Sequence, residues 1–185
     1  GFETFPDAAG AVQAVLSNGF LPSAMEISDR FTLQAARNYV GDGVPRGEAH
    51  LLIEVDGLEK TVPVEISLLQ AMLEQRGAPE ITTAMSDAEC EVLWKLRREF
   101  SYSLRATGLT KLNEDVVVPR GRLVELVQFA EKLQAESGFP VACFGHAGDG
   151  NIHVNVMVRN MNEPAERARA DAALDRLFRF VIGIG

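Results

Sequence analysis

The feature that most constrains the fold of this chain is an Asp-Gly pair, Asp149-Gly150, between two runs of alternating hydrophobic residues. A two-residue type I′ turn needs positive φ at both central positions, and Asp-Gly in this setting is a strong hairpin signal. The sequence therefore predicts a β-hairpin with strands at about residues 140–146 and 151–158.

Centring the turn on the Asp-Gly pair sets the expected pairing of the two strands. His146 then lies directly opposite His153 on one face, with their Cβ atoms about 4.5–5.5 Å apart. Asn155 shares that face, because side chains two residues apart point the same way along a strand. Two imidazoles at this spacing can share one metal ion, so this face is the candidate site.

Two other interpretations of the hairpin stay open. The glycines can serve only the backbone of a tight turn, with the two histidines as polar cross-strand neighbours. The loop can also bind phosphate through its glycine amides, although it lacks the Lys of a P-loop and precedes a strand, not a helix.

The rest of the chain alternates predicted strands with amphipathic helices. A capping box at Ser86–Glu89 begins a long helix over residues 86–105. It joins two βαββαβ-like halves, residues 1–85 and 111–185, the second of which lacks its last strand. The expected strands lie at about residues 1–5, 22–28, 50–55, 80–84, 115–118, 140–146 and 151–158. We therefore predict an α+β fold in which two ferredoxin-like halves form a largely antiparallel sheet covered by helices.

Composition argues against several classes of partner. The 18 Lys and Arg residues against 26 Asp and Glu give a net charge of −8, and no basic cluster offers a footprint for nucleic acid. No apolar run approaches the roughly 20 residues that span a bilayer. Cys90 and Cys143 lie far apart in apolar surroundings, which is typical of buried thiols in a reducing compartment, so we expect a cytoplasmic protein.

The ends of the sequence suggest a piece of a longer polypeptide. The chain starts without Met, and its last helical stretch stops abruptly at Gly183-Ile184-Gly185. A missing last strand would leave a sheet edge open, and such an edge can pair with a second copy to form a homodimer.

Three further residues are candidates for binding an anionic substrate. Arg97 and Ser101 lie four residues apart on one face of the long helix, next to Trp94. Arg can hold a carboxylate through two parallel hydrogen bonds. Lys111 lies between this helix and the next strand. Both basic residues can equally be solvated surface groups, and no Ser-His-Asp or Cys-His arrangement is recognisable.

Several stretches of the sequence resemble the C-terminal domain of FAD-linked oxidases. That family includes D-lactate dehydrogenases, the flavin subunit of glycolate oxidase and D-2-hydroxyglutarate dehydrogenase. The motif His146–His153 is the most specific, and the others follow the family order over nearly the whole chain. These others are Phe5–Ala9, Glu26–Asp29, Leu52–Gly57 and Glu114–Pro119.

The resemblance implies a cap, or substrate, domain that covers a flavin held by a separate N-terminal FAD-binding domain of the same polypeptide. It implies that His146 and His153 bind a divalent metal, for which Zn, Mn and Fe are all suitable. It places Asn155 near the substrate. It also implies that Arg97 grips the carboxylate of a small 2-hydroxyacid, with Ser101 and Lys111 beside it. The implied reaction passes a hydride to FAD, and an electron-acceptor protein or a quinone then reoxidises the flavin.

The sequence departs from the family pattern at its end. Family members continue past the position of Gly185 into a Gly-rich segment with a Glu-His pair, which supplies the third metal ligand and the general base. We therefore expect no catalytic residue within this chain and no activity of the chain alone. The alternatives are a stand-alone module that binds a metal or a small anion, and a folded scaffold without ligand affinity.

Overall fold

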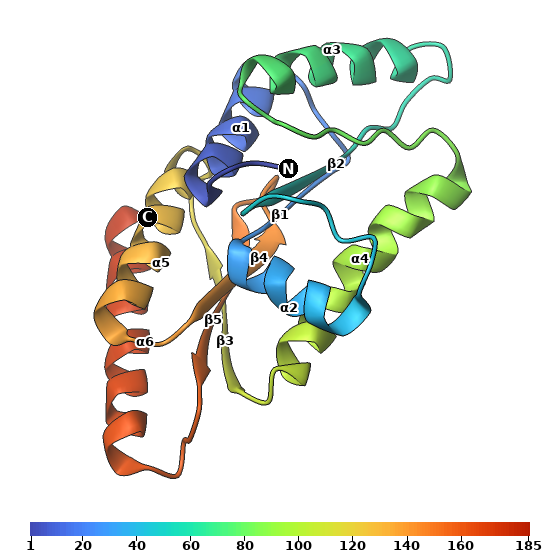
Figure 1. Ribbon diagram of the computed structural model, residues 1–185. Coiled ribbons are helices and arrows are strands. Elements are labelled where there is room, and N and C mark those ends of the chain that lie inside the picture. Colours follow the sequence, from blue (N-terminus) through green and yellow to red (C-terminus); the bar gives the residue numbers. More distant parts are fainter.

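The computed structural model describes residues 1–185 as a mixed α and β protein (Figure 1). In chain order its elements are α1 Phe5–Ser17, β1 Ala24–Ser28, α2 Arg30–Val40, β2 His50–Glu54, α3 Val62–Gln75, α4 Asp87–Ala106, β3 Thr110–Val117, a 3-10 turn at Arg120–Arg122, α5 Leu123–Ser137, β4 Val141–His146, β5 Asn151–Val158 and α6 Pro164–Ile184. The five strands form one sheet in the order β2-β1-β4-β5-β3, with every neighbouring pair antiparallel. This confirms the predicted fold class.

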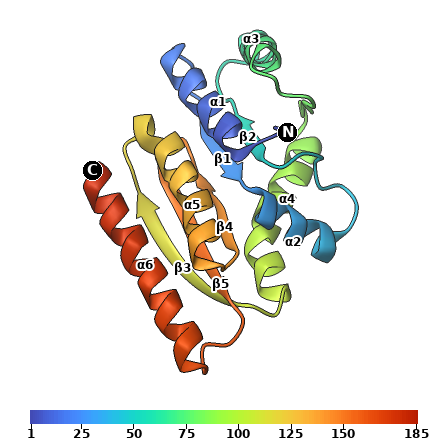
Figure 2. The ribbon, with the colours of Figure 1, turned by 60° about the vertical axis from the view of Figure 1, so that its left-hand side comes forward.

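Helices cover both faces of the sheet (Figure 2). One face packs against α1, α5 and α6, and the main hydrophobic core lies there. Small buried residues such as Ala8 and Ala11 let α1 approach this core closely. The other face packs against α2 and α4 through a smaller core that includes Phe100, Leu104 and Phe144. We call this second face the site face, because the two candidate histidines described below lie on it.

The long helix forms as its sequence predicts. The Ser86 side chain accepts a hydrogen bond from the Glu89 amide, and the Glu89 side chain accepts one from the Ser86 amide, which completes the capping box. Of the apolar residues on this helix, Phe100 and Leu104 are buried, whereas Leu93 and Leu96 are only half-buried. The helix therefore packs on the sheet through its second half.

Two expected strands are not strands. Residues 80–84 are irregular, and Phe2 makes only an isolated bridge to Ala49 before α1 begins at Phe5. A strand needs a hydrogen-bonded neighbour along its length, and neither segment has one. The first half therefore supplies two strands to the sheet, and the pairing of β1 with β4 joins them to the strands of the second half.

The register of the β4–β5 hairpin differs from the prediction. Phe144 lies opposite His153 and His146 opposite Asn151, two residues away from the expected pairing. The turn occupies Ala147–Gly150, with the Asp149 amide donating to the His146 carbonyl and the Gly150 amide to that of Ala147. A shift of two residues keeps every side chain on its predicted face, so the two histidines still share the site face.

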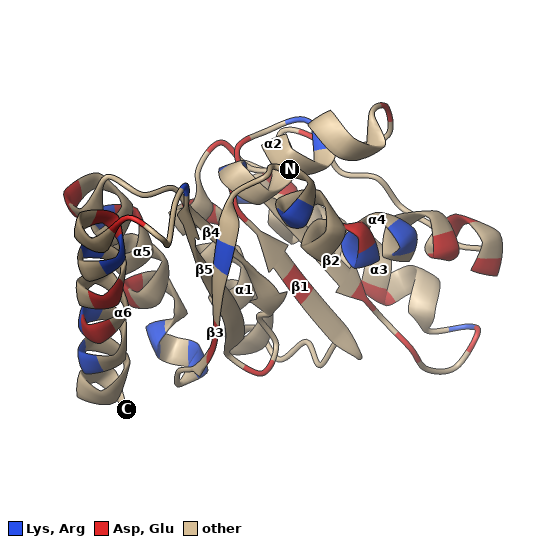
Figure 3. Ribbon diagram, turned by 90° about the horizontal axis from the view of Figure 1, so that it is seen from below, with Lys and Arg blue, Asp and Glu red and all other residues tan.

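Charges of both signs are distributed over the surface. Arg side chains and acidic side chains both occur along α6 (Figure 3), where Arg167 pairs with Asp171 and Arg179 with Asp175. No helix is both long and apolar enough to cross a membrane. Of the two cysteines, Cys143 is buried, as expected, and Cys90 is only half-buried.

Candidate functional site

The two predicted histidines meet on the site face as diagonal neighbours. The ring centres of His146 and His153 lie 6.0 Å apart, and the rings are nearly perpendicular. The His146 side chain is 49% exposed and that of His153 is 23% exposed. Both rings can therefore be reached from solvent while their strands stay fixed in the sheet.

Each histidine is held by a carboxylate on the neighbouring strand. Nδ1 of His146 contacts Glu26 Oε1 on β1, and Nδ1 of His153 contacts Asp115 Oδ1 on β3. The sheet places these partners, because Glu26 lies opposite His146 and Asp115 lies opposite His153. The hydrogen bond to His153 is the largest of the effects that lower the pKa of Asp115. Sequence reasoning gave neither carboxylate a role in the site.

Arg97 reaches the same carboxylate that holds His146. Its Nε lies 2.5 Å from Glu26 Oε2, and the two side chains are 14% and 5% exposed. The Arg97 guanidinium carbon also lies 5.1 Å from the centre of the Phe144 ring, within the range of a cation–π contact. The structure thus brings Arg97 and His146 together, which their separation in the sequence does not reveal.

Ser101 and Lys111 form a second polar pair next to Arg97. Ser101 lies one turn further along α4. Lys111 lies within β3, because this strand begins earlier than expected, and its Nζ donates to Ser101 Oγ at 3.1 Å. Burial and the nearby charge of Arg105 lower the pKa of Lys111, whereas Asp115 opposes this effect. Both residues extend the site from the histidines towards the end of α4.

Asn155 is the most deeply placed of the predicted site residues. It is fully buried, and its Nδ2 donates to the Ala142 carbonyl at 3.0 Å. Its Oδ1 has no hydrogen-bond partner. An unpaired buried acceptor costs about 1–3 kcal/mol.

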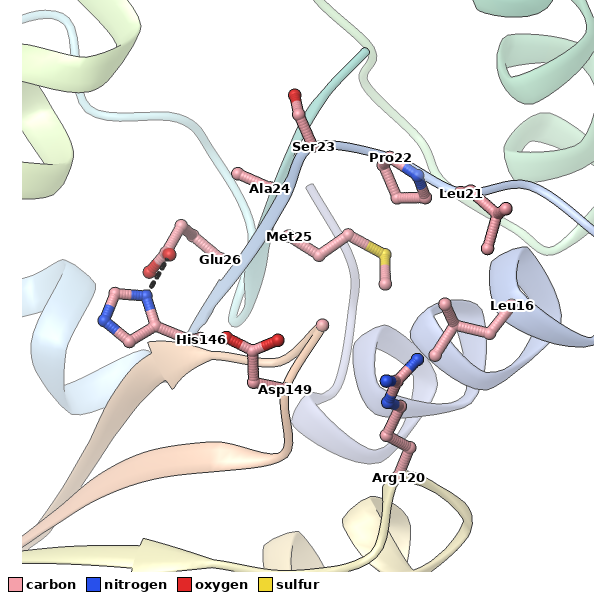
Figure 4. Close-up of a pocket in the computed structure, with 11 residues that line it drawn as sticks. Leu16, Leu21, Pro22, Ser23, Ala24, Met25, Glu26, Arg120, His146 and Asp149 are labelled. Atoms are coloured by element: carbon pink, nitrogen blue, oxygen red, sulfur yellow. Dashed lines mark hydrogen bonds and ion pairs between the residues drawn. The ribbon is translucent and has the colours of Figure 1, made fainter. Parts of the chain in front are cut away.

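Two cavities lie near the site. One of about 280 Å³ opens beside Glu26 and His146 and is bordered by Met25, Arg120 and Asp149 (Figure 4). The other, about 600 Å³ and mainly apolar, runs along β2 between α3 and the start of α4. No group of three or more His, Cys, Asp and Glu side chains is arranged to hold a metal ion.

Comparisons with known proteins identify the family. The family described as "FAD linked oxidases, C-terminal domain" matches residues 1–185. Glycolate oxidase subunit GlcD of Bacillus subtilis is 29% identical over 185 residues, which are 100% of this chain and 39% of that protein. A D-lactate dehydrogenase of Anaerostipes hadrus is 25% identical, with 96% of this chain and 39% of that protein covered.

A solved structure supports the fold. An alkyldihydroxyacetonephosphate synthase superposes with a TM-score of 0.59 at 15% identity, over 97% of this chain and 38% of that one. This likeness concerns the fold alone. The chain spans about two fifths of the length of these relatives. Since the family match covers every residue, the chain belongs to the FAD-linked oxidase family, whose C-terminal domain it represents.

Proposed function

We propose that this chain is the cap domain of an FAD-dependent 2-hydroxyacid dehydrogenase or oxidase of the D-lactate, glycolate or D-2-hydroxyglutarate type. It would supply ligands to a divalent metal and contacts to the substrate carboxylate above the flavin. The observation that carries this function is the joining of Arg97 and His146 by one buried carboxylate, Glu26. The relatives named above are a glycolate oxidase subunit and a D-lactate dehydrogenase, and the matching family is that of FAD-linked oxidases.

The two histidines suit one divalent metal. Because Nδ1 of each ring is bound to a carboxylate, Nε2 is the nitrogen left for a metal. An ion about 2.1 Å from each Nε2 lies roughly 3.3 Å from each ring centre, so centres up to about 6.6 Å apart can share it. The observed 6.0 Å falls within this limit. A third protein ligand would come from polypeptide outside residues 1–185, and Zn, Mn and Fe all suit such a site.

The substrate carboxylate would bind to Arg97. Its Nε is occupied by Glu26, which leaves the two terminal amino groups to form parallel hydrogen bonds. Ser101 and Lys111 would add a donor and a positive charge beside it. Asn155, whose Oδ1 is buried and has no hydrogen-bond partner, would lie near the substrate.

A bound metal would supply Lewis acidity that lowers the pKa of the substrate hydroxyl, and bound FAD would supply a hydride acceptor. The residues of this chain bind and orient the 2-hydroxyacid, whereas the proton acceptor would come from outside it. The glycine-rich loop Gly145–Gly150 precedes a strand, so it lacks the helix N-terminus that holds a diphosphate in nucleotide sites. As the family resemblance implies, a separate domain of the same polypeptide would hold FAD.

Replacing Arg97 in the full-length polypeptide tests the substrate assignment. Arg97→Met should lower kcat/KM for D-lactate, glycolate and D-2-hydroxyglutarate by about 100-fold, since a charge-assisted pair worth about 2–3 kcal/mol is lost. Arg98→Met is the matched control, because Arg98 is 53% exposed and pairs with Glu91 on the surface. Equal effects of the two variants would contradict the assignment.

Metal titration by calorimetry tests the other half of the proposal. Zn²⁺ and Mn²⁺ should bind to the metal-depleted full-length protein, and the His146→Ala/His153→Ala double variant should lose this binding. If the double variant still binds the metal, the two histidines are not its ligands and the hairpin has only a structural role. Binding to residues 1–185 alone, with no 2-hydroxyacid activity of the full-length protein, would favour a stand-alone metal-binding module.

A further inference from the structure

Glu26 is a buried carboxylate with two partners of different kinds. Its side chain is 5% exposed, although it belongs to a strand beside an open cavity. One oxygen meets Nδ1 of His146 on β4, and the other accepts from Nε of Arg97 on α4 at 2.5 Å. Figure 4 shows its carboxylate directed at the His146 ring. Three elements of the fold therefore converge on this one group.

We propose that Glu26 is a positioning residue that fixes the tautomer of His146 and the orientation of the Arg97 guanidinium together. It would thereby couple the metal-binding and the carboxylate-binding sides of the site. This inference builds on the proposed function, but its first consequence, the tautomer of His146, can be measured without metal or substrate.

The contact with His146 determines which ring nitrogen carries the proton. An ionised carboxylate only accepts hydrogen bonds, so a neutral His146 must carry its proton on Nδ1. Nε2 is then unprotonated and can donate its lone pair to a metal. Without Glu26, the imidazole could adopt either tautomer, and its ring could turn because it is half-exposed.

The contact with Arg97 selects which guanidinium atoms remain free. Glu26 accepts a hydrogen bond from Nε, and the guanidinium carbon lies 5.1 Å from the centre of the Phe144 ring. This leaves the two terminal amino groups for other partners. The ion pair also compensates the charge of a carboxylate that would otherwise be buried alone, which is strongly destabilising.

Glu54 provides an internal comparison. It lies on the site face of the next strand, where its carboxylate accepts a 2.5 Å hydrogen bond from Trp94 Nε1. It contacts neither histidine nor Arg97. A carboxylate that serves only to anchor α4 on the sheet would therefore resemble Glu54, whereas Glu26 contacts two groups of the candidate site.

The test is the tautomer of His146 in the 185-residue protein, read from long-range ¹H–¹⁵N NMR spectra of the histidine rings. In the wild type, neutral His146 should be protonated on Nδ1. In Glu26→Gln, which keeps the shape but presents an amide that also donates, the Nε2-protonated form should become substantial. Glu54→Gln is the control and should leave the His146 tautomer unchanged.

A second measurement uses the full-length protein. Glu26→Gln should weaken Zn²⁺ binding about 10–100-fold, the usual effect of removing a partner of a metal-binding histidine. It should also raise KM for the 2-hydroxyacid, and the effects of Glu26→Gln and Arg97→Met on KM should be clearly less than multiplicative. A merely structural ion pair would change stability without shifting the tautomer.

The outcomes separate this inference from the proposed function. A wild-type His146 protonated on Nε2, or a tautomer that Glu26→Gln does not change, overturns the role of Glu26. If Glu26→Gln fails to fold, the tautomer of His146 in the wild type is sufficient to test the role of Glu26. If the tautomer responds as expected but the full-length wild type binds no metal, the metal assignment is wrong. The inference that Glu26 fixes the tautomer of His146 is then still supported.

Discussion

At the scale of single residues, Asp29 shows how a buried carboxyl group connects the sheet to α2. One oxygen accepts from the Thr32 amide at 2.9 Å and so caps α2, while the other accepts from the Cys143 amide of β4 at 2.7 Å. Burial raises the pKa of Asp29 to about 6, and these hydrogen bonds only partly oppose the effect.

Stability should therefore depend on pH through Asp29. An unfolded Asp has a pKa of about 3.9, so between about pH 4 and 6 the folded protein holds this proton more tightly than the unfolded chain does. The stabilising effect is complete below about pH 4 and is lost as the pH rises through about 6. The shift of about two pKa units corresponds to about 3 kcal/mol.

Urea unfolding of the wild type and of Asp29→Asn between about pH 4 and 7 measures this effect. The side-chain amide of the variant does not titrate. The difference in free energy of unfolding between the two proteins should therefore change by about 3 kcal/mol, because the wild type becomes less stable relative to the variant as the pH rises. Groups that titrate in both proteins cancel in the difference. A difference that stays constant over this range would show that Asp29 keeps an ordinary pKa.

Single residues also show what the sequence could predict about the site. The spacing of His146, His153 and Asn155 placed all three on one face, because alternation along a strand is local. Glu26 and Asp115 were not predicted as partners of the histidines. Their roles depend on which strands are neighbours, and β1 and β3 are separated from the hairpin by whole helices.

At the scale of elements, the hairpin shows where prediction from sequence stops. The Asp-Gly pair predicted the hairpin correctly, but its register depends on contacts of the turn with other segments. The Gly150 carbonyl accepts from the Val118 amide at 3.0 Å, and the Gly148 amide donates to the Met25 carbonyl at 3.3 Å. These contacts hold a longer turn than Asp-Gly alone predicts, and they shift the pairing by two residues.

Replacing Gly150 by Ala should therefore damage the hairpin. Gly150 has a φ of +76°, and a Cβ there would lie 2.1 Å from the Val118 carbonyl oxygen. Strain and backbone displacement together should lower the free energy of unfolding by about 2–4 kcal/mol. Gly10→Ala within α1 is the control, since nothing lies within 4 Å of its Cβ position. The better helix propensity of Ala should raise the free energy of unfolding by about 0.5–1 kcal/mol. Chemical denaturation of both variants measures whether the free energy of unfolding falls or rises relative to the wild type. A Gly150→Ala protein as stable as the wild type would contradict this explanation of the turn.

At the scale of the whole molecule, the sheet ends on one side at β2, whose outer edge is only partly paired. Ala49, just before β2, exchanges both of its main-chain hydrogen bonds with Phe2. Because such groups alternate in direction along an antiparallel strand, Leu51 and Ile53 also point their amides and carbonyls outward. No main-chain group pairs with them there, and the apolar cavity of about 600 Å³ follows the same edge.

An unpaired edge beside an apolar cavity favours pairing with another strand, so we expect the 185-residue protein to form a homodimer through β2 as its concentration rises. Ile53→Pro removes an outward amide without removing a hydrogen bond to β1, and it should weaken dimerisation at least 10-fold. Ile53→Val keeps the amide and is the matched control. Sedimentation equilibrium over a range of concentrations measures the dissociation constants. A monomer at every concentration, or equal dimerisation of the two variants, would show that β2 is not the contact between copies.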